Sequence, residues 1–337
     1  MYILNLLPYV KVSVIVTAYN RRKYLPYALK SVINQTAHRN DYEIILIKNF
    51  MDSELDDLCS DNRIKNIYMY GTIGNYLYRG LRESTGDIIT FLDDDDVFTS
   101  DKIEMIIKIY DETKFDFLHN NYDEIDDNGN KRSMFMGKLH FAGKIKHNIE
   151  YKKTKNEKII RKMLNEESDF NLSCMSISSK MVKNVVNIID SIYACQDGFI
   201  FYSSIESGNM IAINDVLTHY RVHTSTTNEL NDYKKFSLSE CDENKRQIES
   251  LEILLPFLSD KAAIDFLSQA IALKKLKSGA LKCRDVDIDI KSLSYVLKPI
   301  INFNIYAGVW FALYLLAFPF GGMVGIAIYK YMKNING

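Results

Sequence analysis

Short apolar runs alternate with amphipathic stretches over the first 125 residues, and this alternation restricts the fold more than any other feature of the chain. The apolar runs at residues 12–17, 42–47 and 88–92 are continuous, which is typical of strands covered on both faces of a sheet. Stretches with helical spacing, such as 22–34 and 76–83, separate them. Because strands that alternate with helices are joined by parallel crossovers, we expect an α/β fold with a Rossmann-like, doubly wound, mostly parallel sheet.

The remainder of the chain changes character twice. Residues 115–125, 174–178 and 211–223 still have the composition of strands, whereas 230–297 shows helical spacing throughout. A long apolar stretch follows the helical part. The predicted parts are therefore an α/β domain at residues 10–225, a small helical module at 230–298 and a hydrophobic C-terminal segment at 303–331.

The C-terminal segment is long enough to reach across a lipid bilayer. No charged side chain lies between Lys298 and Lys330, and residues 305–329 are almost entirely apolar. A spanning helix needs about 20 such residues, and lipid-embedded helices tolerate interruptions such as Pro319. We predict a membrane-associated or transmembrane segment, either a single span or a re-entrant one. The alternative is a buried pair of soluble helices that is broken at Pro319.

Charge and cysteine usage argue against several classes of protein. The 42 Lys and Arg residues nearly balance the 43 Asp and Glu residues, so the chain lacks the basic surplus of a nucleic-acid binder. The five cysteines are scattered, without a C-x-x-C pair, which argues against a disulfide framework and favours a reducing compartment. No G-x-G-x-x-G follows a strand and the sequence contains no P-loop, so dinucleotide-dependent oxidoreductases and P-loop enzymes are poor candidates.

Four consecutive aspartates, Asp93 to Asp96, directly follow the apolar run at 88–92. In open α/β sheets, ligands bind at this carboxyl end of the strands. Adjacent carboxylates repel one another and a divalent cation removes that cost; oxygen ligands favour Mg²⁺ or Mn²⁺. We therefore predict a metal site that also reaches a diphosphate. The alternative is a solvated acidic turn that caps the following helix.

Several motifs, taken in their order along the chain, resemble those of the family 2 glycosyltransferases, which are inverting enzymes with the GT-A fold. The run GLRESTGDIITFLDDDD at 80–96 is similar to the family's glycines, buried strand and Asp-x-Asp-Asp sequence. The resemblance covers residues 10–225, and such an ordered series is more specific than any single motif. The other motifs are VSVIVTAYN at 12–20, SVINQT at 31–36, EIILI at 43–47, QDGF at 196–199 and HYRVH at 219–223.

The resemblance implies a nucleotide-sugar-dependent hexosyl- or glycosyltransferase that uses Mg²⁺ or Mn²⁺. Its donor would be a nucleotide-diphosphate sugar, with a UDP-sugar as the first candidate. Asp197 would be the general base that deprotonates the acceptor hydroxyl, and Asp95 and His223 would bind the metal. The residues implied to bind the nucleotide sugar are Thr17, Ala18, Tyr19, Asn20, Asp93, Asp94 and Arg221.

Each implied role has a chemical reason and a simpler alternative. A base without a protein nucleophile implies inversion, and an arginine offers a fixed fork for phosphate. On the other hand, Asp197 could cap the helix that follows it. Arg221 could pair with a surface carboxylate, and His223 could be an ordinary residue at the end of a strand.

The chain departs from the family pattern after its second strand. Where the family usually has an acidic pair followed by Gly-Ser, this sequence has Lys48, Asn49, Phe50 and Met51. The acidic contact to the nucleobase is therefore missing, and the identity of the base stays open. The amide of Asn49 can still bond a base edge, so we count Asn49 among the nucleotide-binding residues. Lys48 would either add charge toward the phosphates or lie outside the site.

Attachment to a membrane suggests the acceptor and the location. We expect a lipid-linked or cell-surface polysaccharide acceptor, and a catalytic domain in the cytoplasm. Basic residues between 274 and 298 precede the hydrophobic segment, which is typical of a cytoplasmic flank. The alternative function is a catalytically inactive, glycosyltransferase-like membrane scaffold or binding protein. Nucleotidyl transfer is a third possibility, but the chain lacks a Gly-rich phosphate loop.

Overall fold

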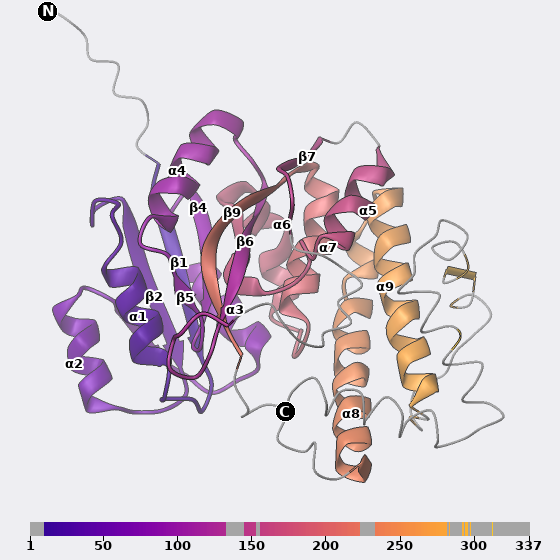
Figure 1. Ribbon diagram of the computed structural model, residues 1–337, viewed down its shortest axis with the longest axis horizontal. Coiled ribbons are helices and arrows are strands. Elements are labelled where there is room, and N and C mark those ends of the chain that lie inside the picture. Colours follow the sequence, from indigo (N-terminus) through magenta and orange to yellow (C-terminus); the bar gives the residue numbers. More distant parts are fainter. Residues whose placement is uncertain are drawn as a thin grey trace, which may run out of the picture.

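The computed structural model describes residues 10–132, 145–152, 156–222 and 233–281, with isolated positions beyond them at 283, 292, 294, 295, 297 and 312. Within these residues nine strands form one sheet, and Figure 1 shows helices on both of its faces. The strands are β1 (Val12–Ala18), β2 (Tyr42–Lys48), β3 (Lys65–Tyr68), β4 (Ile88–Asp93), β5 (Val97–Phe98), β6 (Phe117–Ile125), β7 (Ile149–Lys152), β8 (Met175–Ser178) and β9 (Asn209–Arg221). The helices are α1 (Leu25–Ile33), α2 (Ser53–Asp61), α3 (Ile73–Glu83), α4 (Lys102–Thr113), α5 (Glu157–Asn165), α6 (Ser179–Ile189), α7 (Gln196–Ser207), α8 (Tyr233–Glu252) and α9 (Lys261–Ala280), with short 3₁₀ turns η1 (Leu172–Cys174) and η2 (Leu255–Phe257).

The first half of the sheet is parallel, as predicted. β1 lies between β2 and β4, and β3 extends the sheet beyond β2. The strands predicted at 12–17, 42–47 and 88–92 are confirmed, and each continues one residue further. In the observed register, Thr17 lies beside Asp93 and Ala18 beside Lys48. The residues that follow these three strands therefore emerge along one edge of the sheet.

The second half of the sheet is mixed, and the prediction of a mostly parallel sheet is wrong there. β8 runs antiparallel to both β4 and β6. β9 is parallel to β6 but antiparallel to β5 and β7. A continuous apolar run indicates that a strand is buried on both faces, but it contains no information about the direction of the strand.

Two hydrophobic cores lie on the two faces of the sheet. Alternate β1 residues point to opposite faces: Val14 and Val16 belong to one core, and Ile15 to the other. α1, α2 and α4 cover the first face, and α3, α6 and α7 cover the second. α3 approaches β1 closely at Gly80, where an added Cβ would lie 2.6 Å from a methyl group of Ile15.

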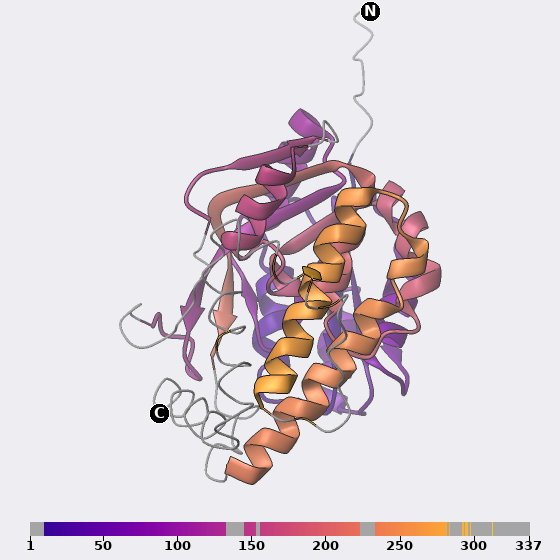
Figure 2. The ribbon, with the colours of Figure 1, turned by 90° about the vertical axis from the view of Figure 1, so that its right-hand side faces the viewer.

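The helical spacing predicted for 230–297 is found as α8 and α9, within the part of that stretch that the structure describes. The two helices lie side by side against α7 (Figure 2). Leu251 of α8 and Phe266 and Leu267 of α9 belong to the core on the second face of the sheet, which also contains residues of α7. Whether residues 230–298 are a separate domain stays a prediction.

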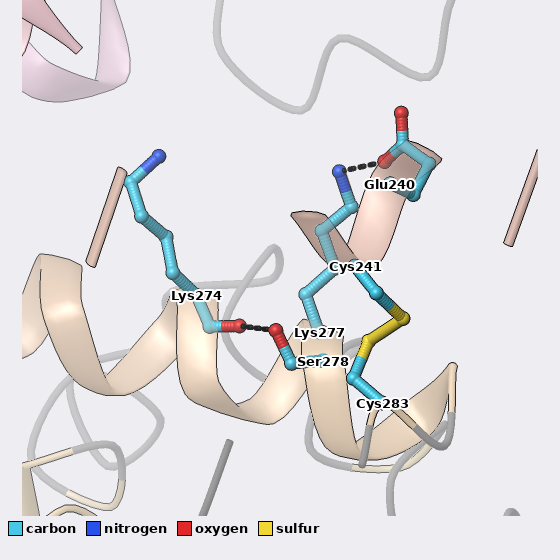
Figure 3. The surroundings of a disulfide bond; sticks show 6 residues. All are labelled: Glu240, Cys241, Lys274, Lys277, Ser278 and Cys283. Atoms are coloured by element: carbon cyan, nitrogen blue, oxygen red, sulfur yellow. Dashed lines mark hydrogen bonds and ion pairs between the residues drawn. A yellow bond between two sulfur atoms is a disulfide. The ribbon is translucent and has the colours of Figure 1, made fainter. Parts of the chain in front are cut away.

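A disulfide joins α8 to the residues after α9 (Figure 3). Cys241 and Cys283 are 42 residues apart in the sequence, with their Cα atoms at 5.4 Å. Beside them, Nζ of Lys277 lies 2.6 Å from a carboxylate oxygen of Glu240. The sequence argued against a disulfide framework and did not predict this pair, because packing of two helices brings together residues whose spacing forms no motif. Cys59, Cys174 and Cys195 are not part of a disulfide.

Two predictions fall on residues that the structure does not describe. Apart from position 312, the hydrophobic segment at 303–331 lies outside the described residues, and so does His223. Among the helices of the described residues, none combines the length and apolar character needed to cross a membrane.

Candidate active site

The carboxyl ends of β1, β2 and β4 bring most of the predicted nucleotide-binding residues to one edge of the sheet. Thr17 and Ala18 end β1 and are buried, whereas Tyr19 is 58% exposed. Thr17 lies beside Asp93, the last residue of β4. The parallel register of neighbouring strands accounts for this grouping, as the sequence predicted.

Asn20 and Asn49 join the loops after β1 and β2 by two hydrogen bonds. The backbone N–H of Asn20 donates to Oδ1 of Asn49 at 2.9 Å, and Nδ2 of Asn49 donates to Oδ1 of Asn20 at 2.9 Å. Asn20 has a φ of 56°, a left-handed conformation that asparagine tolerates. Asn49 is only 6% exposed, and its two hydrogen bonds to Asn20 hold the loop after β1 in place.

Lys48 is buried and bonded within the loop between β2 and α2, which favours the second of the two alternatives for this residue. It is 1% exposed, and its Nζ donates to the carbonyl oxygen of Phe50 at 2.8 Å. The same nitrogen lies 2.9 Å from a carboxylate oxygen of Asp56 in α2. The ammonium group therefore closes the loop between β2 and α2 and does not contribute charge toward a phosphate.

Arg21 neutralises part of the acidic turn that follows β4. One Nη of Arg21 lies 2.6 Å from Oδ1 of Asp94, and the other contacts the carboxylate of Asp95. Burial and the neighbouring carboxylates raise the pKa of Asp93 well above its ordinary value. Burial also raises the pKa of Asp94 to about 7, although the charge of Arg21 opposes it. Full ionisation of the turn therefore requires more positive charge than one arginine provides.

Arg221 lies behind the acidic turn and fastens it to β9. Its backbone N–H donates to Oδ1 of Asp96 at 2.9 Å, and its Nε donates to the carbonyl oxygen of Asp95 at 2.8 Å. Nη1 donates to the carbonyl oxygen of Asp126 at 2.8 Å, and the guanidinium group lies over the ring of Tyr24. Because Arg221 is 4% exposed, it is not the surface ion-pair partner considered from the sequence.

Asn171 connects the acidic turn to Asp197. Its Nδ2 donates to Oδ2 of Asp96 at 2.9 Å, and its backbone N–H donates to Oδ2 of Asp197 at 3.3 Å. Oδ1 of Asn171 accepts the N–H of Ser173, so Asn171 caps the turn η1. The other carboxylate oxygen of Asp197 accepts the N–H of Gly198 at 2.8 Å. A single residue thus joins two acidic groups that are far apart in the sequence.

The surroundings of Asp197 raise its pKa. Burial is the main cause, and the N–H of Gly198 and the charge of Lys274 in α9 oppose it. Burial and the neighbouring charge of Asp197 raise the pKa of Asp169 to about 7, again opposed by Lys274. Asp197 lies in the first turn of α7, but the N-cap residue of that helix is Cys195. The carboxylate of Asp197 is therefore not the N-cap that the sequence offered as the simpler alternative.

A buried lysine supports the acidic turn from the side of α4. Lys102 is fully buried, and its Nζ donates to the carbonyl oxygen of Ser173 at 2.6 Å and to Oγ1 of Thr218 at 3.0 Å. Oγ of Ser173 in turn accepts the N–H of Asp93 at 3.0 Å. Burial lowers the pKa of Lys102 to about 7. This network connects the end of β4 to η1 and β9.

The donor groups of the acidic turn fit a divalent cation. Over the described ranges, no three His, Cys, Asp or Glu side chains are grouped as a metal site, and the second predicted ligand, His223, lies outside them. Mg²⁺ commonly takes only one or two carboxylates and completes its shell with water and substrate phosphates, so Asp95 and Asp93 offer enough protein donors. The excess negative charge of the turn is what such an ion relieves.

Five residues that surround the acidic turn and Asp197 were not predicted from the sequence. Arg21 could have been found, because it directly follows the motif that ends at Asn20. The others carry no motif and reach the site only through packing of η1, α4 and α9. The missed residues are Arg21, Lys102, Asp169, Asn171 and Lys274.

Comparison with known proteins identifies a family for the first half of the chain. The family described as Glycosyl transferase family 2 matches residues 13–186, just over half of the sequence. An uncharacterized glycosyltransferase of Rickettsia bellii is 36% identical over 125 residues, which are 35% of this chain and 18% of that protein. The chain therefore spans only about a fifth of the length of this relative.

A second relative has a described activity. The GalNAc(5)-diNAcBac-PP-undecaprenol beta-1,3-glucosyltransferase of Campylobacter jejuni is 36% identical over 110 residues, which are 29% of this chain and 34% of that protein. Among solved structures, S. aureus TarS 1-349 in complex with UDP-GlcNAc aligns with a TM-score of 0.52 and 14% identity, over 90% of this chain and 89% of that one. At this identity, the structural likeness supports the GT-A fold.

Proposed function

The chain belongs to glycosyl transferase family 2, and on that basis we propose that it transfers a sugar from a nucleotide-diphosphate sugar to a hydroxyl group of a lipid-linked or cell-surface glycan. A UDP-sugar is the first donor to test, because TarS was crystallised with UDP-GlcNAc. The Campylobacter relative, whose name specifies an undecaprenol-linked substrate, supports a lipid-linked acceptor.

The observation that carries this proposal is the link that Asn171 makes between Asp96 and Asp197. Transfer of a sugar needs a group that stabilises the leaving diphosphate and a base that reaches the attacking hydroxyl. The two must lie on opposite sides of one anomeric carbon. A single residue that bonds both the acidic turn and Asp197 supports such an arrangement.

In the proposed reaction, Asp197 accepts the proton of the acceptor hydroxyl while the oxygen attacks the anomeric carbon. The bond from that carbon to the diphosphate breaks, and the nucleoside diphosphate leaves with the electron pair. We assign no protein nucleophile, so one displacement inverts the configuration of the sugar. Arg21, which is partly exposed beside the acidic turn, is placed to pair with the diphosphate.

Asp95, with Asp93, would hold the Mg²⁺ or Mn²⁺ ion expected for this family. When bound, such an ion supplies Lewis-acid stabilisation of charge on the leaving diphosphate. The residues of the chain prepare this position: Arg221 and Lys102 fix the backbone of the turn, and Arg21 shields its carboxylates until the donor arrives.

A nucleotide-binding experiment on the full chain tests the proposal. We expect UDP with Mn²⁺ to raise the melting temperature, because a ligand at 100 times its Kd adds about 2.7 kcal/mol to the free energy of unfolding. Asp95→Asn should abolish the part of the shift that EDTA also removes. Asp61→Asn, which changes an exposed aspartate at the end of α2, is the matched control and should behave as the parent.

The second stage of the experiment is turnover. Purified chain with UDP-GlcNAc or UDP-glucose should release UDP in the presence of a polyprenyl-diphosphate-linked sugar, and Asp95→Asn should not. If no nucleoside diphosphate shifts the melting temperature of the parent chain, the transferase proposal is wrong. The non-catalytic scaffold would then be the better description.

A further inference from the structure

Helix α8 is fastened to the start of α7, the helix whose first turn carries the proposed base. Oγ of Ser250 in α8 accepts the backbone N–H groups of Tyr193 and Ala194, both at 3.2 Å, just before α7 begins. Cδ2 of Leu251 lies 3.7 Å from the place where a Cβ on Gly198 would stand. Gly198 directly follows the proposed base, so α8 covers one side of that turn.

Lys274 of α9 reaches the same place through a side chain of α8. Its Nζ donates to Oε1 of Gln247 at 2.5 Å. Gln247 precedes Leu251 by four residues, so the two side chains lie on one face of α8, one turn apart. Nε2 of Gln247 donates to Oε1 of Glu243 at 2.6 Å, which leaves the amide oxygen directed at the lysine. The ammonium group of Lys274 is therefore held about one helical turn from the residue that covers Gly198.

Further contacts between α8 and α9 fix the two helices relative to each other. Nζ of Lys277 lies 2.6 Å from a carboxylate oxygen of Glu240, and the disulfide follows immediately beside this pair (Figure 3). Nζ of Lys275 lies 2.9 Å from a carboxylate oxygen of Glu252. These lysines already have carboxylate partners in α8, whereas the printed partner of Lys274 in α8 is a neutral amide.

The surroundings of Asp197 favour its neutral form, and Lys274 opposes them. Burial raises the pKa of Asp197, that of Asp169 to about 7 and that of Cys195 to about 12. The charge of Lys274 opposes the rise at all three groups. The hydroxyl of Tyr202 donates to Oδ2 of Asp169 at 3.4 Å, which joins α7 to this cluster. The titratable side chains that act on the two carboxyl groups, besides Lys274, are Glu167, Cys195 and Tyr202.

On the basis of the proposed function, we infer that Lys274 is a positioning residue: α8 and α9 hold its ammonium group beside the first turn of α7, where its charge keeps Asp197 ionised and ready to accept a proton. Lys274 contacts neither donor nor acceptor in this assignment and acts through Asp197. The family matches residues 13–186, so this contribution comes from a part of the chain that the family match does not cover.

A profile of kcat against pH on the full chain tests the inference, with UDP release from a UDP-sugar as the signal. Lys274→Met removes the charge and keeps a long apolar side chain. The acidic limb should move to higher pH by about 0.5 unit or more, because a nearby ammonium group favours the ionised carboxylate. On the alkaline plateau, kcat should stay within about threefold of the parent, since Asp197 is ionised there in both proteins. A purely structural role would lower kcat at every pH without moving the limb.

Three further variants complete the experiment. Lys274→Arg keeps the charge and should restore the parental profile. Gln247→Leu removes the oxygen that holds the ammonium group, so it should move the limb in the same direction by a smaller amount, and it serves if Lys274→Met does not fold. Lys275→Met, which changes the neighbouring lysine paired with Glu252, is the matched control and should keep the parental limb.

A parental acidic limb in Lys274→Met would overturn the inference, as would a shifted limb in Lys274→Arg or in Lys275→Met. If Lys274→Met does not fold, a parental limb in Gln247→Leu has the same consequence. If the parent chain releases no UDP at any pH, the proposed function fails and the inference falls with it, which is distinguishable from a parent that turns over while its variants keep the limb.

Discussion

At the scale of single residues, Asp197 has the role that the proposed reaction depends on most. Its two carboxylate oxygens accept N–H groups from Asn171 and Gly198, and these hydrogen bonds orient it. We expect Asp197→Asn to lower kcat by about 10²- to 10⁴-fold, because the amide cannot accept the hydroxyl proton. The affinity for UDP with Mn²⁺ should stay within about threefold of the parent. A variant that retains parental turnover would exclude Asp197 as the base.

The pH dependence of the reaction follows from the same carboxylate. A base must be ionised to act, and burial raises the pKa of Asp197 above that of an ordinary carboxyl group. The rate should therefore fall, as pH is lowered, at a higher pH than an exposed aspartate would give. A profile of kcat against pH measures this, with UDP release as the signal. An acidic limb at or below about pH 4 would contradict the prediction.

Residue identities were the part of the site that the sequence indicated best. Asp95, Asp197 and Thr17 lie in recognisable motifs, and the structure places them at or near one edge of the sheet. Asn171 and Lys274 have no such motif. Their importance arises from the carboxylates that they approach, and those contacts form only when η1 packs against the sheet and α9 packs against α7.

At the scale of elements, the disulfide between α8 and the residues after α9 gives a direct test. Cys241 and Cys283 close a loop of 42 residues, and a cross-link of that kind contributes typically about 2–4 kcal/mol by restricting the unfolded chain. We expect Cys241→Ser to lower the melting temperature by several degrees. Dithiothreitol should lower the melting temperature of the parent equally.

The control for this prediction is the combination of both treatments. Dithiothreitol should not lower the melting temperature of Cys241→Ser further, since Cys59, Cys174 and Cys195 are not part of a disulfide. A parent chain insensitive to the reductant would show that the bond is absent in solution. It would also agree with the sequence, which argued against a disulfide framework.

At the scale of the whole molecule, the helices α8 and α9 share one hydrophobic core with the α/β domain that contains the sheet. Leu251 of α8 is fully buried, and its Cδ2 lies 3.7 Å from the place where a Cβ on Gly198 would stand. We expect Leu251→Ala to lower the free energy of unfolding by about 2–5 kcal/mol, measured by urea denaturation. Leu238→Ala, on the same helix but 57% exposed, should change it by about 0.5 kcal/mol or less.

A cost near zero for Leu251→Ala would mean that α8 is not packed against α7 in solution. The family domain would then fold without the helical pair, and Lys274 would have no route to Asp197. The same denaturation curves distinguish packed from unpacked helices α8 and α9, because a loosely attached module would produce a second transition.

The sequence by itself determined the parallel half of the sheet, the acidic turn and the family. Those features depend on local patterns: continuous apolar runs for β1, β2 and β4, and a motif that directly follows β4. Tertiary structure alone decided the direction of β8, the pairing of Cys241 with Cys283, and the exclusion of Lys48 from the nucleotide edge. Each of these depends on contacts between residues distant in the sequence, and the pattern of apolar and charged residues within one segment contains no information about such contacts.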